Sequence, residues 1–235
     1  MNTNQSAIDS NSITVAELAV AHPAALSVFN KYNIDFCCGG NRSLEEACIR
    51  IGLNPEKIRQ EIFSSPAQQS TIPMRADKWS ASLLADYIVQ NHHEYVKNAI
   101  PEIEALLAKV CAAHGEDNVE LLNIQQDFAD LAEELLSHMN KEEMALFPAI
   151  KRLEAHNRSG NPLAENLRGP ISMMEHEHAI AGDLVKSIRN LSHNYRVPEY
   201  ACPTYRVTYQ KLKEFDEDLM THVHLENNIL FKNAV

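Results

Sequence analysis

From residue 77 onward, apolar residues recur in four long stretches at alternating spacings of three and four. This period is typical of a helix that buries one face against other helices. The clearest run is Val89, His93, Val96, Ile100, Ile103, Leu107 and Val110, and the run in the second stretch ends at Ala145 and Leu146. The pattern predicts helices at about 79–112, 118–156, 166–194 and 203–232. Because the breaks between them are short, consecutive helices should be antiparallel, which predicts an all-α, up-down-up-down four-helix bundle.

A smaller helical unit precedes the bundle. Thr14 and Glu17 have the spacing of a capping box, and so do Ser43 and Glu46, which predicts two helix starts. The polar first residues are expected to be disordered, and a later stretch rich in Ser, Pro and Gln has the composition of a linker. The predicted organisation is a disordered segment at 1–12, a small helical domain at 13–64, a linker at 65–76 and the bundle at 77–235.

Each apolar stripe is interrupted by a histidine, and two of these histidines are followed four residues later by a glutamate, on the same helix face. One such histidine is more often a core residue with satisfied hydrogen bonds, and one HxxxE pair is more often an exposed ion pair. Four interruptions of the same kind would instead bury several polar groups, a cost that a bound metal offsets. The candidate metal ligands are His93, His138, Glu142, His178, His222 and Glu226.

Four imidazoles and two carboxylates suit two metal ions better than one, because each carboxylate can bridge the pair. Mixed nitrogen and oxygen donors with open positions favour iron, whereas zinc prefers four ligands and magnesium or calcium prefers oxygen alone. A ferritin-like site is the alternative, with Glu-x-x-His on two helices. Glu175 and His178 have that spacing, but no second pair has a matching place in the stripes. We therefore expect two iron ions per chain, joined by an oxo or hydroxo bridge.

Three further histidines lie close to the candidate ligands in the sequence but are not expected to bind metal. His92 should point about 100° away from its neighbour His93 on a helix, so we expect it beside the site or on the surface. His176 and His224 stand two residues from candidate ligands and should face elsewhere, with contacts to the ligands still possible.

The net charge of −11 argues against a nucleic-acid partner, because phosphate binding needs clustered Lys and Arg. No apolar run approaches the ~18–20 residues of a membrane span, and no secretory signal is visible at the N-terminus. Five cysteines are a sparse and odd set, which does not suit a disulfide scaffold. We expect a cytoplasmic protein that binds neither nucleic acid nor a membrane.

Two of the cysteines, Cys37 and Cys38, are adjacent and precede two glycines. They can be ordinary thiols in a tight turn. They can also be soft ligands that accept or escort iron, contact a damaged cluster, or form a mixed disulfide with a partner. Both interpretations stay open from the residues alone.

From about residue 13 to its end, the chain resembles the hemerythrin-like iron–sulfur cluster repair proteins, di-iron proteins of the RIC or ScdA type. The matching segments are TVAELAVAHPAALSVFNKYNIDFCCGG, HHEYVKNAIPEI, HMNKEEMALFP, GPISMMEHEHAIAG and HVHLENNILF. The resemblance implies a hemerythrin-like bundle in which the six candidate residues bind iron, with Glu142 and Glu226 bridging. It also favours a functional role for Cys37 and Cys38. One departure is FK in place of the FP that often closes the last motif.

The resemblance implies a stress-response protein that donates iron from a labile site to iron–sulfur proteins damaged by nitric oxide or peroxide. It also implies a homodimer. Two alternatives remain: an enzyme that reduces nitric oxide to nitrous oxide at the ferrous pair, and a carrier or sensor that binds O2 or NO. A dedicated O2 carrier commonly has a further histidine one turn after His178, where this chain has Gly182. Whether the chain is an enzyme stays open.

Overall fold

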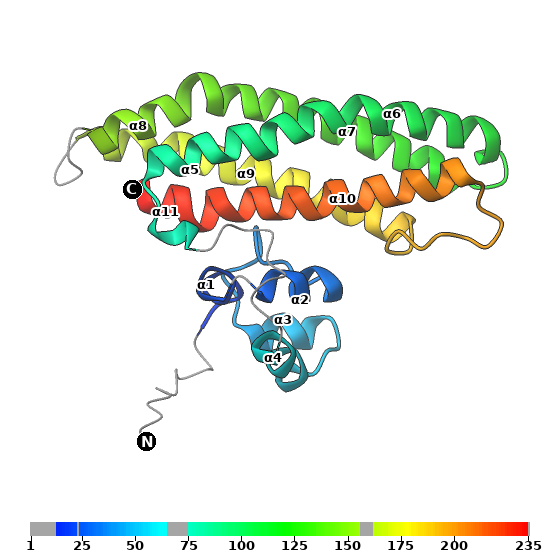
Figure 1. The fold of residues 1–235 in the computed structure, drawn as a ribbon, viewed down its shortest axis with the longest axis horizontal. Coiled ribbons are helices and arrows are strands. Elements are labelled where there is room, and N and C mark those ends of the chain that lie inside the picture. The colour runs from blue at the N-terminus through cyan, green and yellow to red at the C-terminus, as the bar shows by residue number, and fades with distance from the viewer. Residues whose placement is uncertain (1–12, 23, 65–74, 156–161, 235) are drawn as a thin grey trace. The chain divides into compact units, whose positions relative to one another are not determined.

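The computed structural model describes residues 13–22, 24–64, 75–155 and 162–234. The chain divides into two compact units, Met1–Lys78 and Trp79–Val235. The segment 1–12, predicted to be disordered, lies outside the described residues, as does 65–74 of the predicted linker. Each helix of the described residues belongs to one of these two units (Figure 1).

The N-terminal unit is built from short helices that depend on capping and mutual packing, because helices of this length are marginal alone. Both predicted capping boxes are present: the Thr14 and Ser43 side chains each accept the amide three residues on, and the glutamates reach back. Phe29 and Phe36 stack in the core with ring centroids 5.9 Å apart. The helices are α1 (Val15–Ala21), α2 (Ala25–Tyr32), α3 (Leu44–Arg50), α4 (Pro55–Ser64) and the 3-10 turn η2 (Ala76–Lys78).

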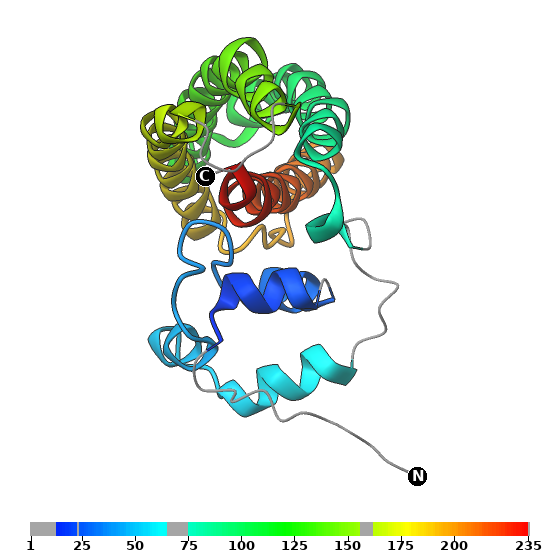
Figure 2. The same cartoon turned by 90° about the vertical axis from the view of Figure 1, so that its left-hand side faces the viewer.

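The second unit contains four long helical segments, three of them interrupted by a π-helical turn. The α6 helix lies against α7 and α10, and α9 lies against the same two helices, which closes the bundle (Figures 1 and 2). The predicted all-α four-helix bundle is confirmed. The segments are α5 (Ala81–Ile88), η3 (Val89–His93) and α6 (Glu94–His114); α7 (Val119–Lys141), η4 (Glu142–Leu146) and α8 (Phe147–Ala155); α9 (Pro162–Leu191); and α10 (Pro203–Leu225), η5 (Glu226–Leu230) and α11 (Phe231–Ala234).

The π turns change the buried face from the one that uniform helical spacing predicts. Two residues predicted to lie on the buried apolar stripes do not. Val89 is only half-buried, and its neighbour Ile88 is buried instead; Ala145 is exposed, whereas Leu146 is buried. In η3 the amide of Glu94 donates to the carbonyl of Val89, five residues back instead of four. Each π turn thus inserts one extra residue, which rotates the following helix relative to the simple pattern.

The other positions of the apolar stripes are buried as their spacing predicts, and they form the bundle core. Val96, Ile103, Leu107 and Val110 of α6 are each at most 1% exposed. Among the described helices, none combines the length and the apolar character needed to cross a membrane.

Candidate metal centre

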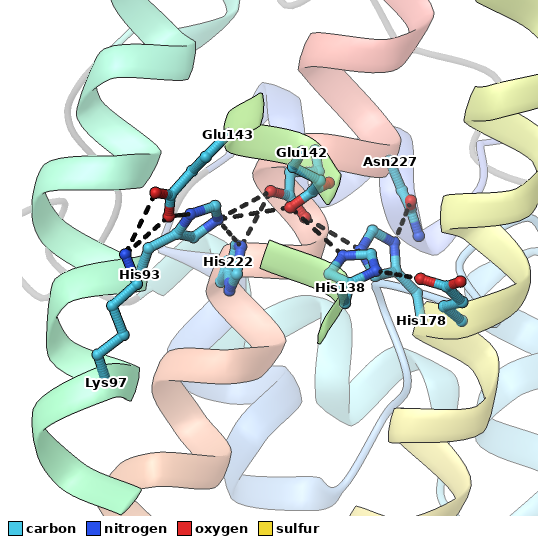
Figure 3. Close-up of polar contacts among 10 residues, drawn as sticks. His93, Lys97, His138, Glu142, Glu143, His178, His222 and Asn227 are labelled. Carbon is cyan, nitrogen blue, oxygen red and sulfur yellow. Dashed lines mark hydrogen bonds and ion pairs between the residues drawn. The ribbon is translucent and has the colours of Figure 1, made fainter. Parts of the chain in front are cut away.

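The structure brings all six candidate ligands together inside the bundle, although they come from four different segments. Figure 3 labels the four histidines and Glu142. Each of the six side chains is at most 3% exposed. Three π turns border the cluster, since η3 ends at one of these residues while η4 and η5 each begin at one. The six are His93 in η3, His138 in α7, Glu142 in η4, His178 in α9, His222 in α10 and Glu226 in η5.

The six side chains form two overlapping groups, each with its ligand atoms within 4.8 Å of one another. Both groups contain the same two carboxylates and differ only in their histidines. Two neighbouring cations held by shared carboxylates would fit this arrangement. The groups are His93, His222, Glu142 and Glu226, and His138, His178, Glu142 and Glu226.

Within each group the two imidazoles face each other through their Nε2 atoms. The Nε2 atoms of His93 and His222 are 3.1 Å apart, and those of His138 and His178 are 2.9 Å apart. Two neutral nitrogens with their lone pairs directed at each other would repel at this distance, so each pair requires a shared proton or a cation. Glu142 lies between the groups, with Oε2 at 3.5 Å from Nε2 of His93 and 3.4 Å from Nε2 of His138.

Glu142 provides a direct test of whether the residues fit a metal. Both of its carboxylate oxygens are buried, and neither has a hydrogen-bond partner within the part of the chain that the structure describes. A buried carboxylate is costly unless a charge or a metal compensates it. The donor set therefore fits bound cations.

The electrostatics of the cluster also favour positive charge. Burial lowers the pKa of His93, but the carboxylates of Glu142 and Glu226 outweigh it and raise the pKa to about 10. For His138 burial likewise lowers the pKa, and Glu142 outweighs it, raising the pKa to about 9. Burial raises the pKa of Glu226, yet the nearby histidines, His222 foremost, hold it well below its usual range. Metal cations would take the place of these protons.

Three of the four histidines are oriented by residues that the sequence analysis missed. Nδ1 of His93 lies 2.8 Å from a carboxylate oxygen of Glu143, and Nδ1 of His138 lies 2.9 Å from one of Glu177. Such a partner holds the ring so that Nε2 faces the centre. For His178 the partner is Oδ1 of Asn227, at 2.8 Å. The available signal was adjacency, since Glu143, Glu177 and Asn227 each stand beside a candidate ligand in the sequence.

The neighbouring histidines differ in their surroundings. His92 is buried beside the site and not on the surface: its ring stacks on His222 with centroids 5.6 Å apart, and its Nδ1 lies 2.9 Å from Asp218. His224 is also buried, with Nδ1 3.0 Å from Asn228, whereas His176 is exposed.

The two adjacent cysteines lie in the N-terminal unit, in a loop held by Asp35. Its Oδ1 accepts the amides of Cys38 at 3.1 Å and Gly39 at 2.9 Å. The two Sγ atoms are 3.5 Å apart, with Cys37 buried and Cys38 partly exposed. The hydrogen bond with Cys38, together with burial, raises the pKa of the Cys37 thiol well above its usual value. A Cβ at Gly40 would come 2.5 Å from a backbone oxygen, so the tight loop requires glycine there.

A four-helix bundle that gathers four imidazoles and two shared carboxylates defines a hemerythrin-like cation-binding protein. In agreement, the profile of the hemerythrin HHE cation binding domain matches residues 84–234, and a family described as a domain of unknown function (DUF542, ScdA N-terminal) matches 11–65. The chain belongs to the hemerythrin-like family of iron–sulfur cluster repair proteins.

Its relatives include proteins similar over almost the whole length. The iron-sulfur cluster repair protein YtfE of Pectobacterium carotovorum is 36% identical over 225 residues, covering 94% of this chain and 96% of the relative. The YtfE protein of Shigella boydii is 36% identical and that of Escherichia coli O8 is 35% identical, with the same coverage of each chain.

Proposed function

We propose that this protein holds two iron ions in the bundle and donates iron to iron–sulfur proteins whose clusters have been damaged. One observation carries the proposal: two four-residue groups of buried nitrogen and oxygen donors share Glu142 and Glu226. Mixed donors of this kind suit iron. The relatives that match almost the whole chain are named iron-sulfur cluster repair proteins, which supports the repair role.

Each residue then has a defined part in binding. His93 and His222 would hold one ion and His138 and His178 the other, while the two glutamates bridge them. Bound iron would supply an exchangeable, redox-active cation that also binds NO or O2. The protein residues orient the imidazoles and exclude water from the donors, because all six side chains are buried. Gly182 follows His178 by one helical turn and offers no further ligand, which supports iron donation over a dedicated O2 carrier.

Iron transfer tests the function directly. Protein loaded anaerobically with radiolabelled ferrous iron is mixed with a metal-free iron–sulfur scaffold protein, and label on the scaffold is measured after separation. We expect transfer by the unmodified protein and loss of it in His138→Ala, because that substitution removes a buried donor from one group. The control is His176→Ala, which changes an exposed histidine of the bundle.

Two results would contradict donation. One is retention of all label by the loaded protein in the presence of the scaffold. The other is conversion of NO to nitrous oxide over many turnovers without any iron transfer, which would instead establish the enzymatic alternative.

We further propose that Cys37 and Cys38 receive or escort the iron, as a soft ligand pair with one accessible thiol. The double variant Cys37→Ser/Cys38→Ser is expected to keep the iron content of the bundle, because the thiols belong to the other unit, and to transfer iron more slowly. Metal analysis and the transfer assay measure the two effects. The matched control is Cys111→Ser/Cys202→Ser, a double change of two partly buried thiols in the bundle unit. Unchanged transfer in the first variant would contradict the role of the pair.

A further inference from the structure

The four histidines of the metal centre are supported unequally on their outer nitrogens. Nδ1 of His93 faces Glu143, which also pairs with Lys97 at 2.9 Å (Figure 3). His138 has a partner of the same kind in Glu177, whose other oxygen pairs with Lys141 at 2.6 Å. Each of these two imidazoles is therefore connected through a carboxylate to a lysine.

At the other two histidines, the contacts of Nδ1 within the described segments are different. Nδ1 of His178 faces the neutral amide oxygen of Asn227. Nδ1 of His222 is buried and has no hydrogen-bond partner in the described segments. One histidine of each metal-binding group is thus supported by a charged partner, and the other is supported by an amide or not at all.

This inequality follows two pairs of helical segments, although Oε1 of Glu226 also lies 3.7 Å from Nε2 of His93. The supported histidines belong to the segments α5–α6 and α7–α8, and both lie within 3.5 Å of Glu142. The less supported histidines belong to α9 and α10, and both contact Glu226: Nε2 of His222 at 2.9 Å and Nε2 of His178 at 3.1 Å. Each ion would therefore have one imidazole from each side.

A carboxylate that accepts the Nδ1 proton makes an imidazole a stronger metal ligand and fixes its orientation. The charge-assisted bond is about twice as strong as a neutral one. An amide oxygen orients the imidazole but adds little negative charge. An imidazole whose Nδ1 has no partner gains neither effect. Lys97 and Lys141 balance the two carboxylates, and their side chains are 37% and 44% exposed, so these chains of contacts reach the solvent.

We propose that Glu143 and Glu177 are positioning residues that make His93 and His138 the firmer ligands, so that His178, Glu226 and His222 would release bound iron first. This inference rests on the proposed iron-donor function and specifies how the site is made labile. Outer partners of metal-bound histidines typically contribute about 10–100-fold to affinity. Glu143 and Glu177 together then set how firmly the chain retains iron.

The test compares the rate of iron loss to a ferrous chelator under anaerobic conditions. Glu143→Gln and Glu177→Gln keep an acceptor of the same shape but remove the charge, and each is expected to lose iron about 10–100-fold faster. Asn227→Asp gives His178 a carboxylate and is expected to slow the loss. Glu143→Asp should restore part of the retention. The control is Asp86→Asn, a surface carboxylate whose ion-pair partner is Lys151.

A second measurement separates positioning from a purely structural role. Binding of iron raises Tm by an amount that depends on its affinity for the folded protein. We expect this increase to shrink in both glutamine variants and to grow in Asn227→Asp. A structural role would instead lower Tm equally with and without iron and leave the increase unchanged, which would overturn the inference.

Different results would contradict the iron-donor function and the positioning role of Glu143 and Glu177. If the unmodified protein binds no iron, the proposed function is wrong and this inference falls with it. If the unmodified protein binds two ions and both glutamine variants lose them at its own rate, the site stands and the inference alone is wrong.

Discussion

Glu226→Ala is expected to leave the bundle without either iron ion, a larger loss of metal than removal of any one histidine, because each histidine belongs to only one group. Its two oxygens contact different groups: Oε1 lies 2.9 Å from Nε2 of His222, and Oε2 lies 3.1 Å from Nε2 of His178. Removing a shared carboxylate therefore takes a ligand from both ions at once. Metal analysis of anaerobically purified protein should fall from two ions per chain to none.

A matched control and a structural check accompany this prediction. Glu217→Ala removes a half-exposed glutamate of α10, the helix that leads into η5, where it pairs with Lys213, and the variant should keep both ions. The helix content of Glu226→Ala, measured by circular dichroism, should stay unchanged. The reason is that most of the bundle core consists of buried apolar side chains, which the substitution does not alter. Retention of one ion in Glu226→Ala would show that the carboxylate is not shared.

Asp216→Asn is expected to reduce the free energy of unfolding of the bundle by about 3–5 kcal/mol, the range for breaking a buried ion pair. The Asp216 side chain is 4% exposed and accepts two bonds from the Arg189 guanidinium. It also accepts the Tyr195 hydroxyl at 2.7 Å. The substitution would leave a largely buried guanidinium without its carboxylate, since Arg189 is only 15% exposed.

The contacts of Asp216 with Arg189 and Tyr195 also hold the turn that follows α9. His193, Asn194 and Tyr195 all have positive φ angles, 49°, 65° and 59°, a conformation that non-glycine residues rarely adopt. The bond from Tyr195 to Asp216 ties that strained turn to α10. Urea unfolding at fixed metal content measures the loss. Glu214→Gln, at an exposed carboxylate of α10 that accepts from Gln210, is the control. A change below about 1 kcal/mol in Asp216→Asn would contradict the role assigned to the network.

Periodic patterns account for what could be predicted of the fold. The apolar spacing located the helical segments, because each helix must bury one face and the repeat follows directly from its geometry. It failed at Val89 and Ala145, where π turns shift the register. A π turn is rare and adds one residue to the helical repeat, so a uniform 3.6-residue period does not predict it.

The metal centre could likewise be predicted in part. The six side chains that meet there were recognisable because histidine and glutamate interrupted apolar stripes at positions four apart. Spacing along one helix carries no information on which histidines from different helices approach each other. The structure pairs His93 with His222 and His138 with His178.

Sequence alone thus determined the helical segments, the two capping boxes and the candidate ligands, because each depends on residues within one or two helical turns. Tertiary structure decided the register after each π turn, the pairing of the histidines, and their unequal support by Glu143, Glu177 and Asn227. These depend on contacts between helices far apart in the chain. Distances in the packed bundle govern such contacts, and local spacing does not specify them.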